Sequence, residues 1–117
     1  MSRYLTEGVK RDLAKGLSVG LVAHTMVGAR AVFASVTDAM KDDAEKISRA
    51  NGAERITTKQ GGEFRVFSRQ SRGMRGVSLD VLVVADRGAY TYEQFRSLME
   101  DVTPIMGTRP NFELITT

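Results

Sequence analysis

The stretch SLDVLVVADRGA, residues 78–89, decides the fold. Residues 79–85 are almost continuously apolar, interrupted only by Asp80, and the carboxylate of Asp86 follows them. A strand covered by helices on both faces has this composition because neither face meets water. The short length, the flanking glycines and the three valines favour a strand over a helix. We therefore predict a central parallel strand with Asp86 at its carboxyl end, where open α/β sheets bind ligands.

The composition is that of an ordinary globular protein and sets limits on the chemistry. The 117 residues are enough for one domain, which we expect to span residues 1–117. Hydrophobic residues make up 42% and charged residues 26%. No apolar run approaches the roughly 20 residues of a membrane span, and the first residues contain no secretory signal. The absence of cysteine excludes disulfides, thiol nucleophiles and Cys-ligated zinc.

The segments before this stretch alternate between helical and strand patterns. We predict a helix at 3–15 ended by Gly16, and a buried strand at 17–24. Thr25 is a candidate cap for a second helix, and apolar residues at helical spacing continue it through Ala44 and Ile47 to a stop at 51–52. Residues 54–59 and 63–68 are β-prone and flank Gly61 and Gly62, the pattern of a hairpin.

After the central strand, Thr91 and Gln94 have the spacing of a capping box. We predict a short helix that ends before Pro104, and a last strand at 111–117. The fold class is therefore α/β: a small, mostly parallel sheet flanked by helices, with a β-hairpin insertion.

Asp86 is the first candidate for chemistry. A carboxylate at the tip of a buried strand can hold Mg²⁺ if a phosphate-binding loop lies nearby. The pattern GxxxxGK[ST] occurs nowhere in the sequence. We therefore favour an Asp86 that solvates the strand end or pairs with Arg87, and we expect no metal and no cofactor.

Basic residues concentrate between positions 55 and 75, in a chain whose net charge is +3. The candidate nucleic-acid-binding residues are Lys59, Arg65, Arg69, Arg72 and Arg75, because guanidinium groups spaced by glycines can contact phosphate oxygens. The alternative is a solvated basic loop. Phe64 and Phe67 are expected on opposite faces of one strand, which argues against a platform for stacked bases.

His24 is the sole histidine, and we interpret it as structural because neither a triad partner nor a metal-ligand spacing accompanies it. Thr116 and Thr117 are expected at the same sheet edge as Asp86.

Residues 49–99, RANGAERITTKQGGEFRVFSRQSRGMRGVSLDVLVVADRGAYTYEQFRSLM, resemble the middle of the ATPase domain of phage terminase large subunits, the motors that package DNA. Residues 109–111, RPN, and 115–117, ITT, are similar to the end of that domain, where a Thr/Ser-rich coupling motif follows a strand. The resemblance covers roughly residues 17–117 and implies a truncated P-loop NTPase fold.

The departures from that family bear on activity. By the resemblance, Ala85 takes the position of the Mg²⁺-binding Asp, and Asp86 that of the catalytic Glu. The family's P-loop belongs just before the first helix and its nuclease domain after the last strand; the sequence contains neither. Phosphoryl transfer depends on these positioning groups, so we expect a degenerate domain that is not an enzyme.

Three functional hypotheses follow. The first is a non-catalytic phage protein that binds a host or phage protein in the cytoplasm of a bacterial host. The second is a DNA-binding module that uses the Arg65–Arg75 surface. The third is a split ATPase whose P-loop comes from another chain. A sheet without its P-loop strand has an open edge, so we also expect a homodimer.

Overall fold

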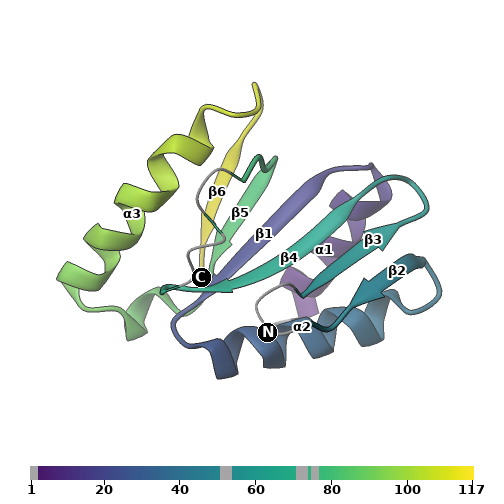
Figure 1. Ribbon diagram of the computed structural model, residues 1–117, viewed down its shortest axis with the longest axis horizontal. Helices are drawn as coiled ribbons and strands as arrows, with labels where there is room; N and C mark the ends of the chain where they lie inside the picture. Colours follow the sequence, from purple (N-terminus) through teal and green to yellow (C-terminus); the bar gives the residue numbers. More distant parts are fainter. Residues whose placement is uncertain (1–2, 51–53, 71–73, 75–76) are drawn as a thin grey trace.

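The computed structural model describes residues 3–50, 54–70, 74 and 77–117 (Figure 1). Its elements are, in chain order, α1 (Arg3–Ala14), β1 (Ser18–Ala23), α2 (Met26–Met40), β2 (Ala44–Ser48), β3 (Arg55–Thr58), β4 (Glu63–Ser68), β5 (Val81–Val84), the short 3₁₀ helix η2 (Arg87–Ala89), α3 (Tyr92–Met106) and β6 (Glu113–Thr116). None of the described helices is both long enough and apolar enough to cross a membrane.

The six strands form one sheet in the order β2-β3-β4-β1-β5-β6. β1 is parallel to both β4 and β5, and β5 is parallel to β6, so four neighbouring strands run in one direction. The pairs β2–β3 and β3–β4 are antiparallel. The predicted strand at 79–85 is thus confirmed as β5, with a parallel neighbour on each side, and the α/β class is confirmed with it.

Helices cover both faces of the sheet, as the apolar run predicts. α1 and α2 pack on one face, and α3 packs on the other beside β5 and β6 (Figure 1). Phe64 is buried among the residues of the α1–α2 face and Phe67 among those of the α3 face, so the two rings lie on opposite faces as predicted. All four residues of β5 are buried, which explains why its sequence has no polar alternation.

Several local signals form the expected structures. Gly16 has a φ of 80° just after α1, and Gly61 has a φ of 86° in the turn between β3 and β4. Residues other than glycine rarely adopt these backbone conformations. Thr91 caps α3 in a complete capping box: its Oγ1 accepts from Gln94 N, and Gln94 Oε1 accepts from Thr91 N.

The prediction that the second helix continues to residue 51 is wrong. α2 ends at Met40, and Ala44–Ser48 form β2, an edge strand that pairs with β3. The register shifts between Ala44 and Lys46, which inserts an extra residue into the strand. The shift lets Ala44 and Ile47 both pack against the α1–α2 core although they are three residues apart. Ala44 and Ile47 therefore have the spacing expected of a helix although they belong to a bulged strand.

The prediction that the last helix ends before Pro104 is also wrong. α3 continues through Pro104 to Met106. Proline removes one N–H donor from a helix, so the cost of including it must be offset elsewhere. Val102 and Ile105 are both buried against the sheet, and their packing holds the last turn in place.

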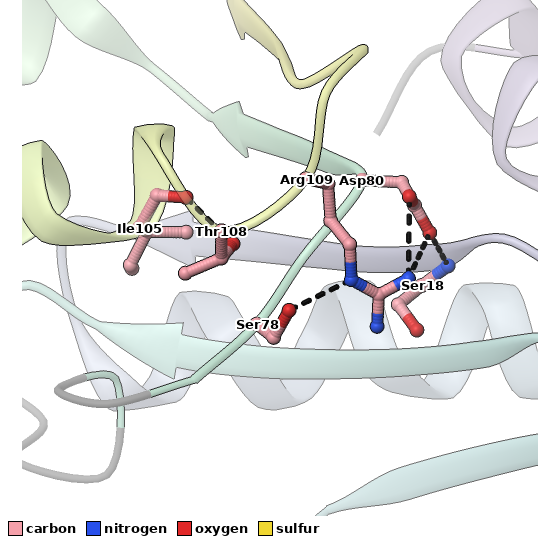
Figure 2. A network of polar contacts seen from close by, with 6 residues as sticks. All are labelled: Ser18, Ser78, Asp80, Ile105, Thr108 and Arg109. Atoms are coloured by element: carbon pink, nitrogen blue, oxygen red, sulfur yellow. Dashed lines mark hydrogen bonds and ion pairs between the residues drawn. The ribbon is translucent and has the colours of Figure 1, made fainter.

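Asp80, the polar residue that interrupts the apolar run, ties three segments together at the amino ends of the strands. Its Oδ2 accepts a hydrogen bond of 2.8 Å from Ser18 N and lies 3.3 Å from Arg109 Nη1 (Figure 2). Arg109 Nε donates to Ser78 Oγ at 2.7 Å. The carboxylate thus joins the start of β1 and the start of β5 to the loop before β6.

Candidate functional site

The parallel strands bring several polar residues to one edge of the sheet. Arg69 follows β4, His24 follows β1, Asp86 comes two residues after β5, and Thr117 follows β6. Since parallel strands end at the same side, these residues lie at the carboxyl edge, the usual ligand site of an open α/β sheet. Asp86 and Thr117 are brought together as predicted: Asp86 N donates to Thr117 Oγ1 at 3.3 Å.

Asp86 is exposed and held in a left-handed backbone conformation. Its φ is 56° and its ψ is 52°, and no other non-glycine residue in the described part of the chain has a positive φ. Asp tolerates this region better than most residues, but it still costs on the order of 1 kcal/mol. Arg87 N donates to Thr117 O at 2.9 Å, so the turn after β5 is tied to the end of β6. The guanidinium group of Arg87 lies 3.7 Å from the centre of the Phe95 ring.

His24 connects the end of β1 to the first turn of α3. Its Nε2 lies 3.0 Å from Gln94 Oε1, the same oxygen that accepts the bond from Thr91 N. Its ring packs edge-on against Tyr90, with 5.0 Å between the ring centres. These contacts agree with the interpretation of His24 as a structural residue, and they assign the proton to Nε2 because Gln94 Oε1 is an acceptor.

Tyr90 is the residue of this edge that the sequence analysis missed. Its hydroxyl group and Arg69 Nε are buried without a hydrogen-bond partner within the described part of the chain. Burial raises the pKa of Tyr90, the charge of Asp86 raises it further, and the charge of Arg69 lowers it. Tyr90 is therefore a neutral phenol whose ionisation is influenced by the positive charge of Arg69 and the negative charge of Asp86. No pattern in the sequence marks it, because the contact depends on how α3 is placed.

At the carboxyl edge the side chain of Asp86 is exposed, whereas the Tyr90 hydroxyl group and Arg69 Nε are buried. Within residues 3–50, 54–70, 74 and 77–117, no group of three or more His, Asp or Glu side chains could hold a metal ion. Ala85, beside Asp86, is 7% exposed and belongs to the α1–α2 core, so its side chain does not reach the solvent at this edge. An exposed carboxylate suits hydrogen bonding and charge pairing with a ligand.

Of the predicted nucleic-acid-binding residues, the structure describes Lys59, Arg65 and Arg69, which are spread along β4 and its flanks. Arg72 and Arg75 lie outside the described residues. Lys59 precedes the six-residue strand β4 and Arg69 follows it, so the length of the strand, roughly 20 Å at about 3.3 Å per residue, separates them. Arg65 lies between them, with its guanidinium carbon 5.4 Å from the centre of the Phe67 ring.

Two arginines form a pair that the sequence alone does not predict, because their proximity depends on the strand register. Arg55 of β3 stands directly opposite Arg65 of β4. Both side chains lie on the sheet face away from α1 and α2, since their neighbours Ile56 and Phe64 are buried on the other face. Glu63 Oε1 lies 3.7 Å from Arg55 Nε and 3.8 Å from Arg65 Nε. One carboxylate is thus shared by two guanidinium groups.

No protein-family model matches this chain, and no curated protein sequence matches it. Solved structures of phage large terminases do match it. The large terminase of a thermophilic bacteriophage superposes with a TM-score of 0.66 at 17% identity, over 87% of this chain and 26% of that one. The fold is terminase-like. Two structures of the large terminase ATPase domain of Thermus phage P74-26 agree: an arginine-to-alanine mutant gives a TM-score of 0.67 and a second structure 0.64, both at 19% identity over 95% of this chain.

The terminase-like chain spans only part of these proteins. It covers 52% and 51% of the two P74-26 ATPase domain chains, and about a quarter of the other large terminase. At this level of identity the comparisons show the fold alone. The resemblance inferred from residues 17–117 is confirmed as a shared fold.

Proposed function

We propose that this chain is a terminase-like phage protein without ATPase activity, which binds a host or phage protein in the cytoplasm of a bacterial host. One observation supports the loss of activity. The resemblance places a metal-binding acid at Ala85, and this side chain is apolar and buried.

The edge of β6 carries the binding part of the proposal. β6 is the last strand of the sheet, with β5 as its neighbour on one side. Glu113 N donates to Asp80 O and Thr117 N donates to Val84 O, so these N–H groups point toward β5. Because alternate residues of a strand point in opposite directions, the N–H and C=O groups of Leu114 and Thr116 point away from the sheet. Such a row of backbone groups is a template for a strand of a partner.

A small groove beside this edge supports the same site. It has a volume of about 180 Å³ and lies between α1 and the strands β5 and β6. Its walls include Leu5 and Val9 of α1, Val83 of β5 and Ile115 of β6. A strand added to β6 would continue the sheet next to this groove, and an apolar side chain from that strand could enter it. A second copy of the chain has the same free edge, so we include a homodimer in the proposal.

Sedimentation equilibrium of the chain and of Thr116→Pro tests the edge. We expect the chain to dimerise as its concentration rises and Thr116→Pro to stay monomeric. Proline is compatible with folding at a position whose N–H points to solvent. Thr116→Lys should weaken the dimer, while Thr57→Lys, a matched change on an inner strand, should not. A monomeric wild-type chain at high concentration would contradict self-association through β6.

Affinity purification from infected cells tests for other partners. The same Thr116→Pro variant should lose a host or phage protein that the unmodified chain retains. Recovery of background proteins alone would count against the partner. Calorimetry with MgATP tests the loss of activity separately: we expect no heat of binding and no phosphate release, and hydrolysis by the purified chain would refute it.

DNA binding is a second candidate, favoured by one observation. Arg55 and Arg65 lie side by side on the sheet face away from α1 and α2, with a single shared acid, Glu63. If they contact phosphates, affinity for DNA should fall steeply as salt increases, because bound counterions are released. Arg55→Glu should abolish a gel shift at low salt, whereas Arg96→Glu, a matched change on the exposed surface of α3, should preserve it. An equal loss in both variants would contradict this site.

A further inference from the structure

A cavity of about 490 Å³ lies between α2 and the edge strand β2, at the opposite end of the strand order from β6. From α2 it is lined by residues at positions 30, 33, 34, 37, 38 and 41, which is one continuous helix face. From the sheet side it is lined by Ile47 of β2 and by the residues that flank the β2–β3 connection, Arg49 and Glu54. Its volume is within the range of pockets that hold small molecules.

The floor of the cavity is apolar with one unused hydroxyl group. Phe33 is buried and Ile47 is partly buried against the α1–α2 core. Thr37 is 7% exposed, and its Oγ1 is buried without a hydrogen-bond partner among the described residues. A buried hydroxyl group without a partner is unfavourable. A ligand with an apolar body and an oxygen near Thr37 would remove this cost.

The rim of the cavity favours an anion. Arg30, Lys41 and Arg49 supply three positive charges, and Asp38 and Glu54 supply two negative charges, which leaves a net charge of +1. Arg30 Nε lies 3.5 Å from Glu54 Oε1, so the buried acid is neutralised within the wall. Lys41 and Arg49 are both exposed at the mouth. Asp38 is also exposed on this rim, so the two exposed cations outnumber the exposed acid by one, and an incoming carboxylate is attracted more strongly than an amine.

We propose that this cavity binds a small aromatic carboxylate: the ring packs on Phe33 and Ile47, the carboxylate pairs with Lys41 and Arg49, and Thr37 contributes a hydrogen bond. The proposal is independent of the edge of β6 and of any ATPase activity, because no residue is shared between the sites.

Titration of the full chain with naphthalene carboxylate, followed by amide NMR shifts, tests the site. We expect the shifts to concentrate in α2 and β2, and the corresponding alcohol and amine to bind more weakly. The double variant Lys41→Glu, Arg49→Glu should weaken binding of the carboxylate about tenfold or more, equivalent to about 1.4 kcal/mol. Thr37→Val should weaken it by a smaller factor without unfolding the helix.

A matched pair of variants separates the cavity from nonspecific binding. Ala34 is an exposed residue of the cavity wall, and Ala31 is an exposed residue of the same helix outside it. Ala34→Trp should fill the cavity and abolish binding, while Ala31→Trp should leave it unchanged. Shifts spread over other elements, equal binding of the alcohol, or equal loss in both tryptophan variants would overturn the proposal.

Discussion

The side chains of His24 and Gln94 are joined by a hydrogen bond of 3.0 Å between Nε2 and Oε1. Gln94 Oε1 also accepts from Thr91 N, so one amide oxygen closes the capping box of α3 and fixes the residue that follows β1. The first turn of α3 is thereby attached to the carboxyl edge of the sheet.

Replacing Gln94 by alanine should therefore remove two hydrogen bonds at once. We expect Gln94→Ala to lower the free energy of unfolding by about 1–2 kcal/mol, measured by urea denaturation. Gln94→Glu keeps an acceptor for both donors and should cost less. If His24→Ala and Gln94→Ala add without coupling in a double-mutant cycle, the bond between the two side chains makes no net contribution.

Asp80 should matter more for stability than its partner Arg109. Asp80→Ala leaves the Ser18 N–H without its acceptor and Arg109 without its anion, so we expect a loss of about 1–3 kcal/mol. Arg109 is 40% exposed, and water screens its ion pair, so Arg109→Ala should cost less than about 1 kcal/mol. Thermal or urea unfolding of both variants measures the difference. Equal losses would show that the ion pair, and not the bond to Ser18, is the larger contribution.

Sequence patterns predicted the elements whose signals are local. The apolar run at 79–85, the glycines at 16 and 61 and the capping box at Thr91 each depend on a few neighbouring residues, and each formed as expected. β2 was missed because its bulge gives Ala44 and Ile47 a spacing that also fits a helix. Pairing with β3, in which Ile47 lies opposite Ile56, favours the strand over the helix at these residues.

The candidate site was predictable only in part, for the same reason. Asp86, His24 and Thr117 are strand-terminal residues, and knowledge of the strands suffices to bring them to one edge. Tyr90 enters the site through the packing of His24 and Phe95 around its ring. The pair of Arg55 and Arg65 depends on a strand register, and a shift of one residue would separate them.

Tyr90 should make the protein less stable at alkaline pH. Its pKa is raised above the ordinary value of 10.0, chiefly by burial. Between the pKa of the unfolded chain and the higher pKa of the folded one, the unfolded state binds fewer protons, so stability falls as pH rises. Below pH about 10 the full contribution is present. We expect the urea midpoint to fall above that pH, and to fall less steeply in Tyr90→Phe.

An absorbance titration of phenolate formation provides an independent measurement for Tyr90. The difference between the chain and Tyr90→Phe isolates the ionisation of this residue from the other tyrosines. Its midpoint should lie above 10.0. Tyr90→Phe should also be as stable as the wild type or more stable at neutral pH, because the variant removes a buried hydroxyl group that has no partner among the described residues. A difference midpoint at or below 10.0 would contradict the assignment of a buried, neutral phenol.

Asp86 should be dispensable for folding, and its replacement should reveal the strain at this position. With a φ of 56° the backbone favours glycine, so Asp86→Gly is expected to raise the free energy of unfolding by up to about 1 kcal/mol. Asp86→Asn should be nearly neutral, because Asn tolerates the left-handed region, and Asp86→Val should destabilise because a β-branched side chain does not. Urea unfolding of the three variants gives the order. A large loss in both Asp86→Gly and Asp86→Asn would mean that the carboxylate itself holds the carboxyl edge together, and its charge would then serve the fold and not an incoming ligand.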